Sequence, residues 1–338
     1  MTEVNVNDQD IVDAVACPPS YEDVQHLIEP FQFPDADVIL RTSIGAEFHV
    51  HTLILSHASP VFKDKFASPS ERLNAHRGSL PVFEVPEDPQ TMHDLLTLVY
   101  HTTADNLNLQ VEDLEFIHRL LLATRKYQME NLQTFVRTLL LDKIPSNPIR
   151  VFAIACLAAE SEIAHTAAGE TLKLPYTDLL TCDVPEFNRL RAETFRKLLN
   201  FHHESGKISA NVIRSFRSPE CSVPHHVYRA AYLQVGGSSM DCRSFWWGRY
   251  LQKIEQTSLF QPILPDYKST QMFQGFCDAV QNCRKCSPVA CLKLIELGER
   301  IEEQIHTLQS MNEMVCAFLK QNCSMTTNIL THIFFRRL

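Results

Sequence analysis

The stretch PDADVILRTSIGAEFHVHTLILSHASPVFKDKF, residues 34–66, contains two short alternating runs, a turn, and then a change to helical spacing. Apolar and polar residues alternate over 36–42 and 47–52, as in a β-hairpin with one buried face, around the turn Ser43-Ile44-Gly45. After the second run, apolar residues recur at helical intervals. Pro60 permits a new helix to start, because proline is tolerated at the first helical position. The stretch therefore predicts a hairpin followed by two short helices.

The residues of this stretch resemble the BTB/POZ domain, whose signature is Asp-Val-x-apolar, then Phe-x-x-His, a Lys or Arg, two residues, Leu, and Ser-x-x-Phe. Thr52 occupies the basic position of that signature. The resemblance implies an α+β BTB/POZ fold, with a small β-sheet flanked by helices, over residues 31–144. The matching residues are Asp37, Val38, Phe48, His51, Leu55, Ser56, Ser59 and Phe62.

Later segments follow the order of the same family. Residues 82–85 are expected to form a third strand, and Asp88-Pro89 is expected to open a helix, because aspartate caps a helix and proline suits its first turn. A leucine-rich helix ending in Lys-Tyr is expected over 114–129. Another amphipathic helix begins near Leu132, with apolar residues at i, i+3, i+4, i+7 and i+8. Because several segments agree with the family in the same order, the resemblance is more specific than one based on a single motif.

At 338 residues the chain exceeds the usual size of one domain, about 100 to 200 residues, so a second domain is expected. Residues 1–30 are acidic and polar and are predicted to be a disordered arm. A helical extension is predicted over 145–180, where Asn147-Pro148 opens one helix and Pro175 ends the next. A mainly α-helical C-terminal domain is predicted over 181–338.

Helical periodicity in the C-terminal domain predicts a helix over 192–205 with Gly206 as its C-cap, then helices over 245–254 and 271–281. A last long helix begins near residue 288 and carries an apolar stripe with heptad-like spacing. For that helix we keep two interpretations, packing against the second domain or a coiled coil. The phrase PIRVFAIACLAAE, which starts at Pro148, resembles fungal BTB proteins, particularly those of mushrooms.

Composition limits the classes of function. The chain has 40 acidic and 31 basic residues and a formal net charge of −9, so no direct nucleic-acid contact is expected. No run approaches the roughly 18 apolar residues of a membrane span, and no signal-peptide pattern opens the chain. Eleven cysteines, most of them within helical patterns, indicate a reducing compartment. We therefore expect an intracellular protein of the cytoplasm or nucleus without a membrane partner.

No catalytic residue is predicted, because the sequence contains no GxSxG, GxxxxGK or HExxH motif. His51 is interpreted as a core histidine with hydrogen-bond partners rather than as a general base.

The candidate contact residues follow from the family signature. In BTB domains the acidic and basic members of the signature meet in a charged pocket at the centre of the dimer. Asp37 matches the acidic member, but Thr52 cannot form the ion pair, so Asp37 is expected to make local hydrogen bonds. The apolar residues of the first helices cannot all face one small core. The residues expected at a homodimer or partner interface are Asp37, Leu53, Ile54, Leu55 and Phe62.

An alternative function is that of a substrate adaptor of a cullin-based ubiquitin ligase. Many BTB proteins contact the cullin through a loop that carries an apolar residue two positions before a glutamate. The corresponding loop here, SPSERLNAHRGSLP, offers only Pro69-Ser70-Glu71. A cullin is therefore kept as an alternative partner.

A second alternative is a zinc-stabilised nuclear regulatory protein. Cys283-Arg284-Lys285-Cys286 is a CxxC pair that can supply two thiolates to a tetrahedral zinc ion. Cys221 and His225, or the neighbouring His226, are the candidates for the other two ligands. The competing interpretation is that these are ordinary reduced cysteines on helices and that no cofactor is bound.

The main prediction is a non-enzymatic protein-protein interaction module. It is expected to form a homodimer through the BTB domain and to recruit a further protein.

Overall fold

The computed structural model describes residues 21–68, 80–100, 113–216, 251–263 and 298–307. The chain divides into two compact units, residues 1–137 and residues 138–338.

A small mixed β-sheet forms the centre of the first unit. The order of its three strands among the described residues is β2-β1-β3, with β1 (Val38–Arg41) antiparallel to β2 (Glu47–Val50) and parallel to β3 (Val82–Glu84). Leu40 is paired with Phe48 on one side and Phe83 on the other. Gly45 turns the hairpin with a φ of +88°, a conformation that suits glycine. The predicted runs therefore contain the strands, and the pleat buries every second residue.

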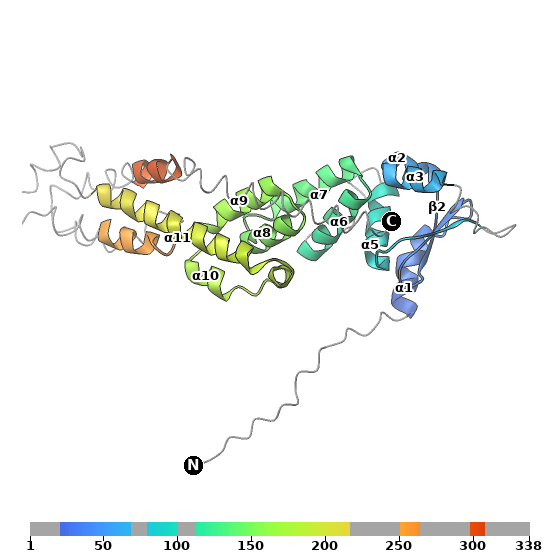
Figure 1. The fold of residues 1–338 in the computed structure, drawn as a ribbon, viewed down its shortest axis with the longest axis horizontal. Coiled ribbons are helices and arrows are strands. Elements are labelled where there is room, and N and C mark those ends of the chain that lie inside the picture. The colour runs from blue at the N-terminus through green and yellow to red at the C-terminus, as the bar shows by residue number, and fades with distance from the viewer. Residues whose placement is uncertain (1–20, 69–79, 101–112, 217–250, 264–297, 308–338) are drawn as a thin grey trace, which may run out of the picture. The chain divides into compact units, whose positions relative to one another are not determined.

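Helices cover this sheet. α2 packs against α3 and α5, and α1 packs against α5 (Figure 1). Residues 21–28 were assigned to a disordered arm, and that assignment is wrong because they form α1, whose Leu27 carbonyl is bonded by His93 Nδ1 at 2.8 Å. The elements of this part of the chain are α1 (Tyr21–Ile28), η1 (Glu29–Phe31), α2 (Thr52–Ala58), α3 (Pro60–Ala67), α5 (Pro89–Tyr100), α6 (Leu114–Lys126) and α7 (Glu130–Asp142).

Short polar side chains cap the starts of two helices in the first unit, α3 and α6. Ser59 precedes Pro60, and its Oγ accepts a hydrogen bond from the Phe62 amide at 3.1 Å. Asp113 does the same for the amide of Glu115 at the start of α6, at 2.9 Å. These caps satisfy amides that have no partner within their own helix.

The second unit is helical throughout its described parts. α8 and α9 pack as a pair, and α10 lies beside α11 (Figure 1). Arg150 Nε on α8 bonds Glu186 Oε1 at 2.9 Å, which ties that pair to the short helix η3. The elements are α8 (Pro148–Leu157), α9 (Ser161–Thr171), α10 (Tyr176–Thr181), η3 (Pro185–Arg189) and α11 (Ala192–Ser215).

The predicted end of α11 is wrong. The helix does not stop at Gly206 but continues to Ser215. A Cβ at position 206 would lie 2.6 Å from the carbonyl oxygen of Leu259, so this glycine allows another segment to approach the helix closely. Gly206 therefore permits close packing and does not end the helix.

Later helices are described only in part. Residues 251–258 and 298–307 are helical, and the predicted helix over 271–281 lies outside the described residues. Ile301 and Ile305 of the predicted apolar stripe are buried, and the Arg300 guanidinium lies 5.8 Å from the centre of the Phe216 ring. Among the described helices, none combines the length and the apolar character that crossing a membrane requires.

Candidate interaction surface

The exposed side of α2 is the clearest candidate for protein contact. Leu53 keeps 80% of its surface exposed, the largest exposure among the large hydrophobic residues of the described chain. His57, one helical turn later, is also exposed, and Ile54 beside them is half-buried. We call these three residues the α2 face.

The α2 face belongs to a stretch without formal charge. No Asp, Glu, Lys or Arg occurs from Phe48 to Phe62, although such residues make up 21% of the chain. A single exposed leucine is ordinary on a soluble protein. An exposed side of a helix without charged residues is less common, and depletion of charged residues is typical of the core of protein interfaces.

Two of the residues predicted for the interface instead form the core. Leu55 and Phe62 are both 0% exposed, and the Phe62 ring stacks on Tyr127 with centroids 4.4 Å apart. Neither side chain can reach another protein while the fold is intact. Of the apolar residues in that prediction, the surface therefore retains Leu53 and part of Ile54.

Asp37 is used locally. Its carboxylate accepts hydrogen bonds from the Thr52 amide at 2.7 Å and from the Thr52 hydroxyl at 2.5 Å. The contact joins the start of β1 to the start of α2, and both carboxylate oxygens are occupied. Thr52 thus occupies the place of the basic signature residue and binds Asp37 without bringing a positive charge.

His51 lies between the sheet and α5. Its Nδ1 is 3.0 Å from the hydroxyl of Tyr100, which also accepts a bond from the His51 amide at 2.9 Å. Its Nε2 is 3.3 Å from a carboxylate oxygen of the exposed Asp35, and its ring packs 5.0 Å from that of Phe33. Burial raises the pKa of the Tyr100 hydroxyl above its ordinary value. The histidine is thus held in position from several sides.

A buried polar group anchors the helices beneath the α2 face. Glu87 is 9% exposed at its side chain, pairs with the Lys126 ammonium and accepts a hydrogen bond from the Tyr127 hydroxyl. Burial, followed by the charge of Glu87, raises the pKa of Tyr127 far above its ordinary value. Ser59 Oγ donates to the Tyr127 carbonyl at 2.6 Å. The junction of α2 and α3 is thereby fixed to the end of α6.

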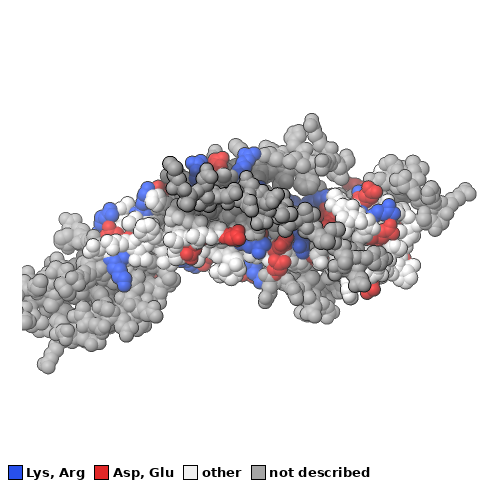
Figure 2. All heavy atoms as spheres, turned by 90° about the horizontal axis from the view of Figure 1, so that it is seen from below, with Lys and Arg blue, Asp and Glu red and all other residues white. Residues whose placement is uncertain are grey.

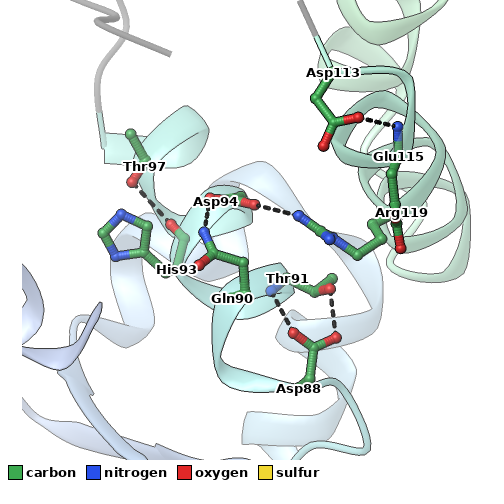
Figure 3. A network of polar contacts seen from close by, with 9 residues as sticks. All are labelled: Asp88, Gln90, Thr91, His93, Asp94, Thr97, Asp113, Glu115 and Arg119. Atoms are coloured by element: carbon green, nitrogen blue, oxygen red, sulfur yellow. Dashed lines mark hydrogen bonds and ion pairs between the residues drawn. The ribbon is translucent and has the colours of Figure 1, made fainter. Parts of the chain in front are cut away.

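A second polar network joins α5 to α6 (Figure 3). Asp94 is buried and accepts hydrogen bonds from Gln90 at 2.8 Å and from Arg119 at 3.5 Å. Burial raises the pKa of Asp94 despite those two partners. For Asp88, burial also favours the neutral acid, but the hydrogen bonds from Thr91 and the charge of Arg119 outweigh it and lower the pKa. These carboxylates fix helix geometry.

The other predicted sites fall where the structure gives no description. Cys221, His225, Cys283 and Cys286 lie outside the described residues, as does the Pro69-Ser70-Glu71 loop. Within the described ranges, no group of three or more His, Cys, Asp or Glu residues is arranged to hold a metal ion. On the face shown in Figure 2, acidic and basic side chains of the described parts are intermingled.

The family model of the BTB/POZ domain matches residues 28–144. The chain carries a BTB/POZ domain. The small mixed sheet flanked by helices is the architecture expected for it. A search of curated proteins gives no match to the chain.

The BTB domain assigns a class of function. BTB domains are protein-protein interaction modules and not enzymes. The match supports this domain but not the finer likeness to fungal proteins.

Sequence reasoning missed two residues that support the surface. Tyr100 closes its helix with a hydroxyl that bonds His51, and Glu87 lies just ahead of Asp88-Pro89. The Lys-Tyr pair at the end of the leucine-rich helix was the available signal, because a buried tyrosine hydroxyl needs a hydrogen-bond partner and a half-buried lysine favours an acidic one.

Proposed function

We propose that this chain self-associates through the α2 face of its BTB domain and presents its helical second unit to a further protein. The single observation that carries the proposal is Leu53, which is 80% exposed in the first turn of a helix without Asp, Glu, Lys or Arg. A symmetric dimer uses the same patch on both copies, so each leucine would contact the equivalent helix of its partner.

The chemistry of α2 supports self-association over attraction to a charged partner. Two copies of an acidic or basic patch repel each other, whereas two copies of an uncharged apolar patch do not. Ser59 at the end of α2 bonds the carbonyl of Tyr127, whose hydroxyl bonds Glu87, and this attachment of α2 lowers the entropy lost on association.

The Asp37 contacts support a departure from the charged-pocket mode of partner binding. Thr52 takes the basic position of the signature, so the ion pair of the charged pocket cannot form there, and Asp37 keeps its negative charge while both of its oxygens accept hydrogen bonds from Thr52. Partners of this domain are therefore proposed to bind through apolar and neutral polar contacts.

Co-purification of two differently tagged copies tests the proposal. The copies should co-purify as wild type, and Leu53→Glu in both should weaken their association at least about tenfold, which corresponds to about 1.4 kcal/mol. Ile44→Glu is the matched control, because Ile44 is 56% exposed on the hairpin turn, away from α2. Equal retention of the Leu53→Glu and wild-type copies would contradict the proposal.

A further inference from the structure

The turn between α9 and α10 is joined to a much later segment of the chain, residues 258–263. Consecutive backbone groups of the turn take part, so the two segments are bonded along their length rather than at one point. The hydrogen bonds are Ile263 N to Leu172 O at 2.9 Å, Gln261 Nε2 to Lys173 O at 2.6 Å and Tyr176 N to Phe260 O at 2.7 Å.

α11 holds both partners of this attachment. His202 Nε2 lies 3.0 Å from the carbonyl oxygen of Leu174, so the ring donates its proton there and reaches the turn. One helical turn further on, Gly206 lies against the backbone of Ser258 and Leu259. The same side of α11 thus contacts the turn and the 258–263 segment.

His202 is buried in this arrangement, and no acidic side chain of the described ranges pairs with it. Its exposure is 0%, and within the described residues its Nδ1 has no hydrogen-bond partner. The titratable neighbours are Tyr176 of α10, whose ring centroid is 5.5 Å away, and His203 of α11. The nearby carboxylates have other partners. Glu170 at the end of α9 pairs with Lys173, and Glu255 on the 251–258 helix pairs with Arg214 of α11.

We propose that His202 makes the attachment of residues 258–263 pH-sensitive, so that this segment loosens from the α9–α10 turn on acidification. Among the described residues only carbonyl oxygens and no carboxylate bond His202, so a proton on Nδ1 would place a positive charge there without a counter-charge from this part of the chain. A buried charge without a partner is costly, and the chain avoids that cost by separating α11 from the turn. Histidine is the side chain whose ordinary titration lies in this pH range.

The folded chain favours the neutral His202 ring, so the attachment should weaken as the pH falls. Burial lowers the pKa of His202, against the carbonyls of Leu174 and Thr171, which favour the charged form. The unfolded chain therefore takes up a proton at a higher pH than the folded chain. The stabilisation is complete above the ordinary histidine pKa of about 6.5 and decreases as the pH falls below it.

Hydrogen exchange on the full-length chain tests this inference. The amides of Ile263 and Tyr176 report the attachment, and the amide of Ala158, the C-cap of α8, which bonds the Ile154 carbonyl, serves as the reference. After correction for the intrinsic pH dependence of exchange, protection of the two reporter amides should fall at least about threefold from pH 7 to pH 5. One titrating group can change an opening equilibrium by at most about tenfold per pH unit, so a fall of this size is within its reach. Protection of the reference amide should not change.

Two variants separate His202 from its neighbour. His202→Gln keeps a donor for Leu174 and should remove the pH dependence, whereas the exposed His203→Gln should keep it. Unchanged wild-type protection, or a His202→Gln chain that still loses protection, would overturn the inference. Titration of the His202 ring by NMR provides a readout in the wild type. A midpoint below about 6.5 that coincides with the loss of protection is expected, and a midpoint above it would also overturn the inference.

Discussion

Thr52 and Tyr127 are the residues that determine what the surface of the BTB domain can do. Thr52 stands at a position where the signature has a basic residue, so that position carries no charge. Its amide and hydroxyl bond the two carboxylate oxygens of Asp37. Tyr127 stacks on Phe62 and bonds Glu87, so one side chain serves the core and the polar anchor together. The residue that precedes the α2 face, Thr52, therefore brings no charge, and Tyr127 holds the helices that carry this face.

Tyr127→Phe should lower the free energy of unfolding by about 1 to 3 kcal/mol. The ring stacking is kept, but a carboxylate oxygen of the buried Glu87 loses its donor. Urea denaturation followed by circular dichroism measures the change. Glu84→Gln is the control, because that side chain is exposed, and its effect should stay within about 0.5 kcal/mol. Equal stability of Tyr127→Phe and wild type would show that the hydroxyl contributes nothing.

At the scale of the elements, the ends of helices are harder to predict from the sequence than the helices themselves. α6 and α8 both end on a left-handed residue that is not glycine, Gln128 with a φ of 52° and Ala159 with a φ of 55°. After α8, the amide of Glu160 bonds the Ala155 carbonyl at 2.8 Å, which is the bond that a glycine C′ residue usually permits. Because no glycine follows these helices, the sequence offers no glycine stop signal there. Gly206 misleads in the opposite direction, since it lies within α11.

Ala159→Gly should raise the free energy of unfolding by about 0.5 to 1 kcal/mol. Glycine adopts the left-handed conformation without the steric penalty that alanine has there. Ala153→Gly, in the buried interior of α8, should have the opposite effect of about 1 kcal/mol or more. Thermal unfolding of the two variants beside wild type distinguishes them. A destabilising Ala159→Gly would mean that the left-handed residue is not strained.

Gly206→Ala and Gly169→Ala should differ in sign. Both glycines lie within helices, so alanine adds helix propensity at both, by about 1 kcal/mol. A Cβ at 169 meets nothing within 4 Å, but at 206 it would lie 2.6 Å from a backbone oxygen. Thermal unfolding should therefore show Gly169→Ala stabilised and Gly206→Ala destabilised. Stabilisation by Gly206→Ala would contradict the close crossing.

At the scale of the whole molecule, the sequence predicts the BTB domain well and the second unit less well. Asp37, Phe48, His51 and Phe62 occupy the places that the signature implies, because a short β-hairpin and its following helices are coded locally. The exposures of Leu53 and Leu55 could not be read from the helical spacing alone. Which of these two leucines faces the core depends on α3 and α5, which pack against α2 and come later in the chain.

The second unit depends on contacts between distant segments. Ile263 bonds Leu172, and His202 bonds Leu174, so segments on either side of residue 180 are held together. A boundary between a helical extension and a C-terminal domain was predicted at that residue from periodicity and prolines. Such signals report where helices break, but they carry no information on which helices then pack together.

The central claim is self-association through the α2 face, and sedimentation equilibrium of the full-length wild-type chain near neutral pH tests it most directly. At concentrations of about 10 μM, a range in which a dimer of moderate affinity is populated, the mass should be twice the 38.7 kDa of one chain. Leu53→Glu should return it to that of one chain, and Ile44→Glu should not. A wild-type mass of one chain throughout this range would contradict the account.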